Sequence, residues 1–286
     1  MKRILAAVLA VAMPAFAATP VPAGKWSFEF RDARGRADRP IRVYTYRPQR
    51  CDSACPIVIV MHGVKRNAYD YIGHWELAAD RHNFIVLAPE FNARAWPRAA
   101  AYDLGDVEGQ PDPEKWAFAA VEHLFDEVRD GQAGYALFGH SAGGQFVHRM
   151  AMFRPDHRAT TMVAANPGWY TMPEWRKDKA KAAFPYSLVG SPAGEAQLRK
   201  ALQRRMLVLV GEKDSEPDAE NLNQSAGAKL QGEGRLDRGE NFFKAATSAA
   251  TELGVPLAWE LHEIPATAHD AAAMSRIASD LLFGKK

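Results

Sequence analysis

One serine in this 286-residue chain is enclosed by glycines, in the stretch YALFGHSAGGQF at residues 135–146. Ser141 follows a short apolar run and precedes a segment with helical spacing, and Gly139, Gly143 and Gly144 surround it. Each of these glycines would weaken an ordinary strand or helix. A sharp strand-to-helix turn, in contrast, requires small residues two positions from the serine and exposes its hydroxyl. The pattern therefore predicts a nucleophilic serine, and a tight packing turn is the alternative.

A serine hydroxyl becomes a good nucleophile only when a base removes its proton, and a carboxylate must orient that base. In sheets with such a turn the acid follows the nucleophile along the chain, and the base comes last. The stretch RMLVLVGEKDSEPD places Asp214 just after a predicted strand, with Glu212, Glu216 and Asp218 as competitors. The preceding predicted strand is followed by Asn166, which is no carboxylate and so strengthens the assignment of Asp214 as the acid.

The stretch ELHEIPATAHDAAA offers two histidines as the base. His262 lies within a predicted strand, where a packed or half-exposed histidine is expected. His269 lies in the loop beyond, just before the last helical pattern, and we predict that it is the base. The other histidines outside the turns of the site are interpreted as structural: His74, His82, His123, His148 and His157. No His-Glu-x-x-His spacing occurs, so we expect no metal.

A second turn should complete the site. The strand IVIVMHG ends in a His-Gly-Val turn that would lie beside the nucleophile in the sheet. The backbone N–H groups of Val64 and Ala142 could then bind the oxyanion of a tetrahedral intermediate. His62 is interpreted as a residue that orders this turn, and His140 as a side chain packed inside the serine turn.

The elements around these residues predict an α/β fold with a mostly parallel central sheet and helices on both faces. Two alternating segments, KWSFEFRD and IRVYTYRP, favour an antiparallel hairpin at the N-terminal edge. Continuous apolar runs are typical of strands buried on both faces: PIVIVMHG, FIVLAPE, YALFGH, TMVAANPG and MLVLVGEKD. Helical spacing occurs between the strands and after the last one, at 70–82, 115–129, 142–154, 241–253 and 271–282.

Residues 1–17, MKRILAAVLAVAMPAFA, have the pattern of a secretory signal: two basic residues, a short apolar run and an Ala-x-Ala site. An uncleaved membrane anchor is the alternative. We therefore expect a secreted or periplasmic protein without stable membrane insertion, with residues 18–286 as a single domain. The formal net charge of +2 falls to zero without Lys2 and Arg3, so nothing indicates a nucleic-acid partner. Cys51 and Cys55 are predicted to form a surface disulfide, with free thiols as the alternative.

Taken together, the segments MHGV, GHSAGG, LVLVGEKD and PATAHD resemble the α/β-hydrolase family, in the family's order and over nearly all of residues 18–286. Within that family the chain is similar to the polyhydroxybutyrate depolymerase and feruloyl esterase group. Depolymerase-like members often carry a cysteine where Val64 stands, and no separate polymer-binding domain follows. The resemblance implies an exported serine esterase with the triad Ser141, Asp214 and His269.

The expected reaction is cleavage of a small or oligomeric carboxylic ester through an acyl-enzyme intermediate, without a cofactor. Two segments longer than ordinary connections, 91–114 and 167–204, are rich in Trp and Tyr and are predicted to form walls or a small lid. Trp169 and Tyr170 are predicted to contact the substrate, with packing inside the lid as the alternative. A serine peptidase of the same fold is the second reading, and a hydrolase-fold protein that binds without catalysis is the third.

Overall fold

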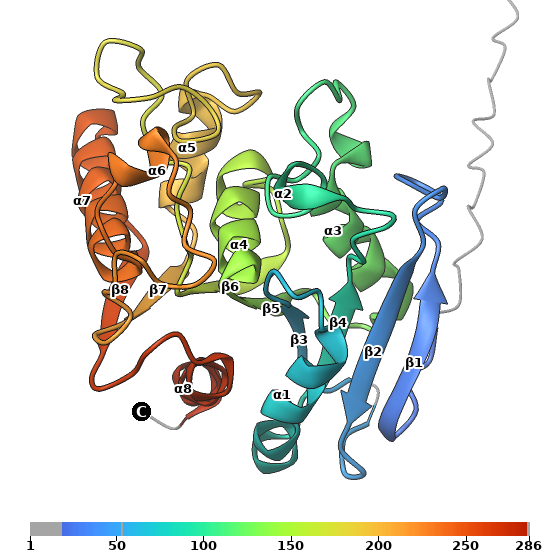
Figure 1. Cartoon of the computed structure of the whole chain (residues 1–286). Helices are drawn as coiled ribbons and strands as arrows, with labels where there is room; N and C mark the ends of the chain where they lie inside the picture. Colours follow the sequence, from blue (N-terminus) through green and yellow to red (C-terminus); the bar gives the residue numbers. More distant parts are fainter. Residues whose placement is uncertain (1–18, 53, 285–286) are drawn as a thin grey trace, which may run out of the picture.

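The computed structural model describes residues 19–52 and 54–284. Within this part of the chain the strands form one eight-stranded sheet in the order β1-β2-β4-β3-β5-β6-β7-β8 (Figure 1). The strands are β1 (Gly24–Phe30), β2 (Ile41–Arg47), β3 (Ile57–Met61), β4 (Ile85–Glu90), β5 (Tyr135–His140), β6 (Ala159–Ala165), β7 (Met206–Gly211) and β8 (Trp259–Ile264). β1 pairs antiparallel with β2, and β2 with β4, whereas all other pairs are parallel. The predicted mostly parallel sheet with an N-terminal antiparallel hairpin is confirmed.

Helices cover both faces of this sheet, because its central strands are apolar on both sides. The helices are α1 (Ala68–His82), α2 (Arg98–Ala101), α3 (Ala117–Val128), α4 (Ala142–Phe153), α5 (Glu195–Leu202), α6 (Ala226–Lys229), α7 (Arg235–Leu253) and α8 (Ala271–Phe283), with a short 3₁₀ turn at Pro113–Lys115. In Figure 1, α1 and α8 lie together below the sheet, and α3, α4, α5 and α7 lie above it.

The alternation of side chains along β3 shows how the core divides. Ile57, Ile59 and Met61 belong to the core beneath α3, α4 and α7, whereas Val58 and Val60 belong to the core beneath α1 and α8. All five side chains are buried. Burial of such a side chain contributes about 1.5–3 kcal/mol. The two cores therefore hold β3 rigidly, and β3 ends in the His-Gly-Val turn.

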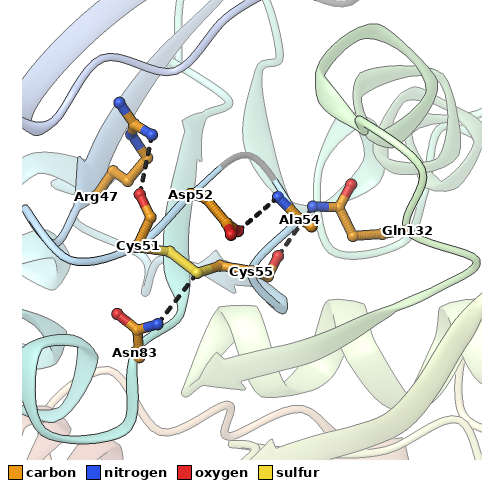
Figure 2. The surroundings of a disulfide bond; sticks show 7 residues. All are labelled: Arg47, Cys51, Asp52, Ala54, Cys55, Asn83 and Gln132. Carbon is orange, nitrogen blue, oxygen red and sulfur yellow. Dashed lines mark hydrogen bonds between the residues drawn. A yellow bond between two sulfur atoms is a disulfide. The ribbon is translucent and has the colours of Figure 1, made fainter.

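A disulfide joins Cys51 and Cys55 in the loop between β2 and β3 (Figure 2). The Arg47 guanidinium donates a hydrogen bond to the Cys51 carbonyl at 2.9 Å, and the Asn83 amide donates to the Cys55 sulfur at 3.3 Å. The loop is therefore tied both to β2 and to the end of α1. The structure contains the predicted disulfide, but both cysteines are buried against the core and do not lie at the surface as predicted.

The predicted signal sequence, residues 1–17, lies outside the described residues and stays a prediction. In the ranges 19–52 and 54–284, no helix has the combination of length and apolar character that crossing a bilayer requires.

Candidate active site

Ser141 lies in the turn between β5 and α4, at the edge of the sheet predicted from the sequence. Its backbone has φ 59° and ψ −119°, a conformation that residues with a side chain rarely adopt. The Ser141 backbone N–H donates to the Ala165 carbonyl at 2.9 Å, which ties the turn to the end of β6. A strained serine at a strand-to-helix turn, held by its neighbours, is the geometry of a nucleophile elbow.

The glycines around Ser141 are required by the close approach of other backbone segments. A Cβ atom on Gly139 would lie 2.2 Å from the Gly143 carbonyl oxygen, and one on Gly143 would lie 2.1 Å from the Met61 carbonyl oxygen. A Cβ on Gly144 would lie 2.7 Å from the Ala165 carbonyl oxygen. The turn is thus packed against itself and against the ends of β3 and β6, and any larger residue would push these segments apart.

Asp214 and His269 meet although 55 residues separate them. The His269 Nδ1 atom lies 2.6 Å from Asp214 Oδ2, in a hydrogen bond between the loops that follow β7 and β8. Two of the competitors have other partners: Glu212 accepts a hydrogen bond from the Ala266 backbone, and His262 lies beside Glu260 on β8. Glu216 and Asp218 are exposed, and neither is hydrogen-bonded to His269. The structure therefore pairs the acid and the base that the sequence favours.

Asn166, which follows β6, holds these loops in place. Its side-chain oxygen accepts a hydrogen bond from the Gly211 N–H at 2.9 Å, and its side-chain nitrogen donates to the Ala268 carbonyl at 3.2 Å. Asn166 is buried and has φ 43°. The amide therefore joins the end of β6 to the end of β7 and to the residue before His269.

Arg235, at the start of α7, was not singled out by the sequence. Its guanidinium donates to Asp214 Oδ1 at 3.0 Å and to the Glu220 carbonyl at 3.0 Å. The Arg235 and Asp214 side chains are only 3 % and 4 % exposed, so this ion pair is buried. The two carboxylate oxygens of Asp214 are thus divided between Arg235 and His269.

A cavity of about 480 Å³ opens above these groups, within the size range of sites for small molecules. Ser141, Asp214 and His269 line it together. Part of the lining comes from the turn after β3 and from α1, and another part from Arg235 and four residues after Asp214, namely Glu216, Ala219, Glu220 and Asn221. The stretch after Asp214, which carries little information in the sequence, therefore supplies a wall of the site.

The turn after β3 lies beside the nucleophile. A Cβ atom on Gly63 would lie 3.7 Å from the Cβ of Ser141. Val64 is the next residue of this turn, so its backbone N–H lies close to Ser141. Ala142 is the first residue of α4, and the N–H of a first helical residue has no partner within the helix. In residues 19–52 and 54–284, neither N–H donates to another group. Both predicted oxyanion donors are therefore free to bind a ligand.

Burial disfavours the charged form of two histidines near the site, His62 and His140. The imidazole of His62 bridges the Gly63 carbonyl and the Phe91 N–H, and burial lowers the pKa of His62 to about 3. The His140 ring packs on the His269 ring with centroids 4.5 Å apart, and burial holds the pKa of His140 well below its usual value. His74, which the sequence suggested is structural, lines the cavity. In the described part of the chain, no three His, Cys, Asp or Glu side chains are placed to hold a metal ion.

Comparisons with known proteins place this chain in a family. The chain matches no protein-family model and no curated protein. It is similar to the structure of poly(aspartic acid) hydrolase-1 from Sphingomonas sp. KT-1, at 36% identity and a TM-score of 0.85, over 91% of this chain and 99% of the other. It is equally similar to a poly(3-hydroxybutyrate) depolymerase from Bordetella parapertussis, at 36% identity and a TM-score of 0.85, over 92% of this chain and 90% of the other. The chain belongs to the α/β-hydrolase family.

More distant members share the fold of this α/β-hydrolase. An S-formylglutathione hydrolase from Agrobacterium tumefaciens aligns over 94% of this chain and 97% of its own, at 16% identity and a TM-score of 0.57. This match shows the common sheet and helices. The resemblance predicted from MHGV, GHSAGG, LVLVGEKD and PATAHD is confirmed.

The aromatic segments of this α/β-hydrolase lie away from the cavity. No residue of 91–114 or 167–204 lines it. Trp169 is buried beneath the Arg149 guanidinium, whose central carbon lies 4.2 Å from the ring centroid. Tyr170 is fully buried and stacks on Phe242 with centroids 4.4 Å apart. The structure thus does not bring Trp169 and Tyr170 to Ser141, and their contacts favour the packing alternative.

Gly143→Ala should destabilise the α/β-hydrolase by about 3 kcal/mol and lower its activity. The new methyl group would meet the Met61 carbonyl oxygen at 2.1 Å and the His62 carbonyl oxygen at 2.9 Å, so the elbow and the turn after β3 must separate. Urea unfolding measures the change in free energy. Gly73→Ala is the matched control, because no atom lies within 4 Å of its Cβ position in α1. It should raise the free energy of unfolding by about 0.5–1 kcal/mol, since alanine favours a helix more than glycine does. Equal unfolding midpoints for the two variants would contradict the packing argument.

Proposed function

We propose that this α/β-hydrolase is a serine esterase that cleaves carboxylic esters through an acyl-enzyme intermediate. One observation carries the proposal: the hydrogen bond between His269 and Asp214 lies in the same cavity as the strained Ser141. Asp214 accepts the Nδ1 proton of His269, which leaves Nε2 as the basic nitrogen. The three side chains are then a nucleophile, a base and the carboxylate that orients the base.

The proposed reaction has two halves. His269 takes the hydroxyl proton of Ser141 as the serine oxygen attacks the ester carbonyl, and the N–H groups of Val64 and Ala142 bind the oxyanion. The alcohol leaves with the proton from His269, and water activated by His269 then releases the acid. No hydrogen bond joins Ser141 to His269 in the described residues, and such bonds often form only when substrate binds.

The substrate class is proposed from the cavity and from the relatives. A cavity of about 480 Å³ accommodates a small ester or one end of an oligomer. One relative is a poly(3-hydroxybutyrate) depolymerase, which supports an ester of a hydroxy acid. The other is a poly(aspartic acid) hydrolase, whose polymer is joined by amide bonds. That relative favours amide hydrolysis by the same residues as the second candidate function.

Hydrolysis of chromogenic esters from acetyl to long acyl groups, together with a feruloyl ester, tests the proposal. A matched set of amides, poly(aspartic acid) and a poly(3-hydroxybutyrate) suspension should be run beside them. We expect turnover of short esters, at rates well above those of the matched amides. Amide turnover without ester turnover would instead support the second candidate. A folded protein that cleaves nothing in the panel and resists a fluorophosphonate would contradict both.

We also propose that the protein is exported. The pattern of residues 1–17 supports export, and so does the Cys51–Cys55 disulfide, because disulfides persist in oxidising compartments. Sequencing of the mature protein should find Ala18 at its N-terminus. An N-terminus at Met1 in the recovered protein would contradict cleavage.

A further inference from the structure

Tyr71 is a cavity residue that the proposed reaction does not use. It belongs to α1, its side chain is nearly buried at 3 % exposure, and it lines the same cavity as Ser141. Its hydroxyl oxygen accepts a hydrogen bond from the Gly63 backbone N–H at 3.1 Å. In the part of the chain that the structure describes, the hydroxyl proton has no acceptor.

The Tyr71 hydroxyl lies close to the nucleophile. A Cβ atom built on Gly63 would be 3.2 Å from the Tyr71 oxygen and 3.7 Å from the Ser141 Cβ. Tyr71 and Ser141 therefore flank the same point on the turn after β3. Val64, whose N–H is the first proposed oxyanion donor, is the next residue of that turn. A carbonyl oxygen bound above this turn would lie between the three groups.

The chemistry of the phenol suits a donor. Burial raises the pKa of Tyr71 above its ordinary value, so the hydroxyl keeps its proton throughout the working pH range of a serine hydrolase. Because the oxygen already accepts from Gly63, one lone pair is occupied and the proton is directed away from the backbone. A buried hydroxyl whose proton has no protein acceptor is costly unless a ligand accepts it.

We propose that Tyr71 is a third oxyanion donor, whose hydroxyl donates a hydrogen bond to the negatively charged oxygen of the tetrahedral intermediate. The proposal rests on the proposed serine hydrolase function. It assigns Tyr71 a direct part in the reaction, beside the N–H groups of Val64 and Ala142. The hydrogen bond strengthens as charge develops on the oxygen, so it acts mainly on kcat.

Tyr71 could instead act only as a brace for the turn, and Tyr102 provides the comparison. The Tyr102 hydroxyl donates to the His62 carbonyl at 2.8 Å, one residue before Gly63. Tyr102 is fully buried and does not line the cavity. Tyr71→Phe and Tyr102→Phe therefore each remove one hydroxyl that braces the same turn, and Tyr71→Phe alone removes a donor next to Ser141.

The test is a comparison of kcat, KM and inhibition by an alkyl boronic acid, which forms a tetrahedral anionic adduct with an active serine. Tyr71→Phe should lower kcat by about 10²-fold, leave KM nearly unchanged and weaken the boronic acid by a similar factor. Tyr102→Phe should change each quantity by less than about threefold, since it leaves all donors in place. Thermal unfolding of both variants checks that each is folded.

Three results would overturn the inference. In the first, Tyr71→Phe keeps the wild-type kcat. In the second, the kcat of Tyr71→Phe falls no further than that of Tyr102→Phe. In the third, Tyr71→Phe loses kcat but binds the boronic acid as tightly as wild type. The last two results would leave Tyr71 as a brace. A failure of the proposed function is separate, because the wild-type enzyme would then cleave no ester and resist the fluorophosphonate.

Discussion

Ser141→Ala is expected to lower kcat for a short ester by about 10⁶-fold, the scale on which serine hydrolases lose activity without their nucleophile. The loss follows from the elbow: φ 59° at Ser141 holds its hydroxyl at the cavity, and among the described residues no other serine or threonine lines the cavity to replace it. A small rate above that in water should remain, because the oxyanion donors are still present. Steady-state kinetics measures the change in kcat. The variant is purified on equipment that has not held wild-type enzyme, so that traces of wild type do not add to its rate.

Fluorophosphonate labelling checks the same prediction without a substrate. The probe should label the wild-type protein and fail to label Ser141→Ala. Ser215→Ala is the matched control, because Ser215 is exposed and follows Asp214 without lining the cavity. It should keep wild-type labelling. Ester turnover above about 1% of wild type in Ser141→Ala would exclude Ser141 as the nucleophile, since loss of a nucleophile costs far more.

Arg235→Met is expected to destabilise the fold by about 3–5 kcal/mol and to lower kcat by about 10²-fold. The substitution leaves the Asp214 carboxylate buried without its cation, and such a charge is strongly unfavourable. Asp214 also loses the contact that fixes one of its oxygens, so the imidazole of His269 is held less firmly. Urea unfolding and steady-state kinetics measure the two effects.

A second buried pair supplies the control. Arg149 lies 3.3 Å from Asp103 and is fully buried, but it does not line the cavity. Arg149→Met should therefore destabilise the fold by a similar amount, about 3–5 kcal/mol, while kcat of the folded enzyme changes by less than about threefold. Equal losses of kcat in Arg235→Met and Arg149→Met would contradict a role of Arg235 in holding Asp214.

A double variant tests the physical reason. Adding Asp214→Asn to Arg235→Met removes the uncompensated carboxylate, so part of the lost stability should return. Activity should fall further, because an amide at this position no longer favours the productive tautomer of His269. A double variant less stable than Arg235→Met would show that the buried charge is not the cause of the destabilisation.

The parts of the site that the sequence predicts are those with a local signature. Ser141 lies in a five-residue pattern whose glycines are required by nearby backbone. A Cβ atom on Gly139 or Gly143 would lie only 2.1–2.2 Å from a carbonyl oxygen of another residue. Asp214 and His269 each follow an apolar strand, and parallel strands bring their carboxyl ends to one edge of a sheet. The order of the apolar runs was therefore enough to predict the fold and to choose Asp214 and His269 from among their neighbours.

The predicted walls of the site illustrate what composition cannot decide. Trp169 and Tyr170 occur in a long segment, which favours a binding wall. Aromatic side chains fill cores as readily as pockets, however, and in this chain both pack against buried residues. One wall is built instead by Glu216, Ala219, Glu220 and Asn221, which have no distinctive pattern. Arg235 on α7 ties this segment to the site, because its guanidinium binds both Asp214 and the Glu220 carbonyl.

The sequence by itself determined the order of strands and helices, the strained serine turn and the places of Asp214 and His269 in the loops after the last two strands. These features depend on residues that are close together in the sequence, so they can be predicted without a structure. Only the tertiary structure decided that Arg235 shares Asp214 with His269, that Tyr71 lies beside Ser141, and which loops enclose the cavity. Such contacts join residues from separate elements, and the packing of helices on the two faces of the sheet sets their distances.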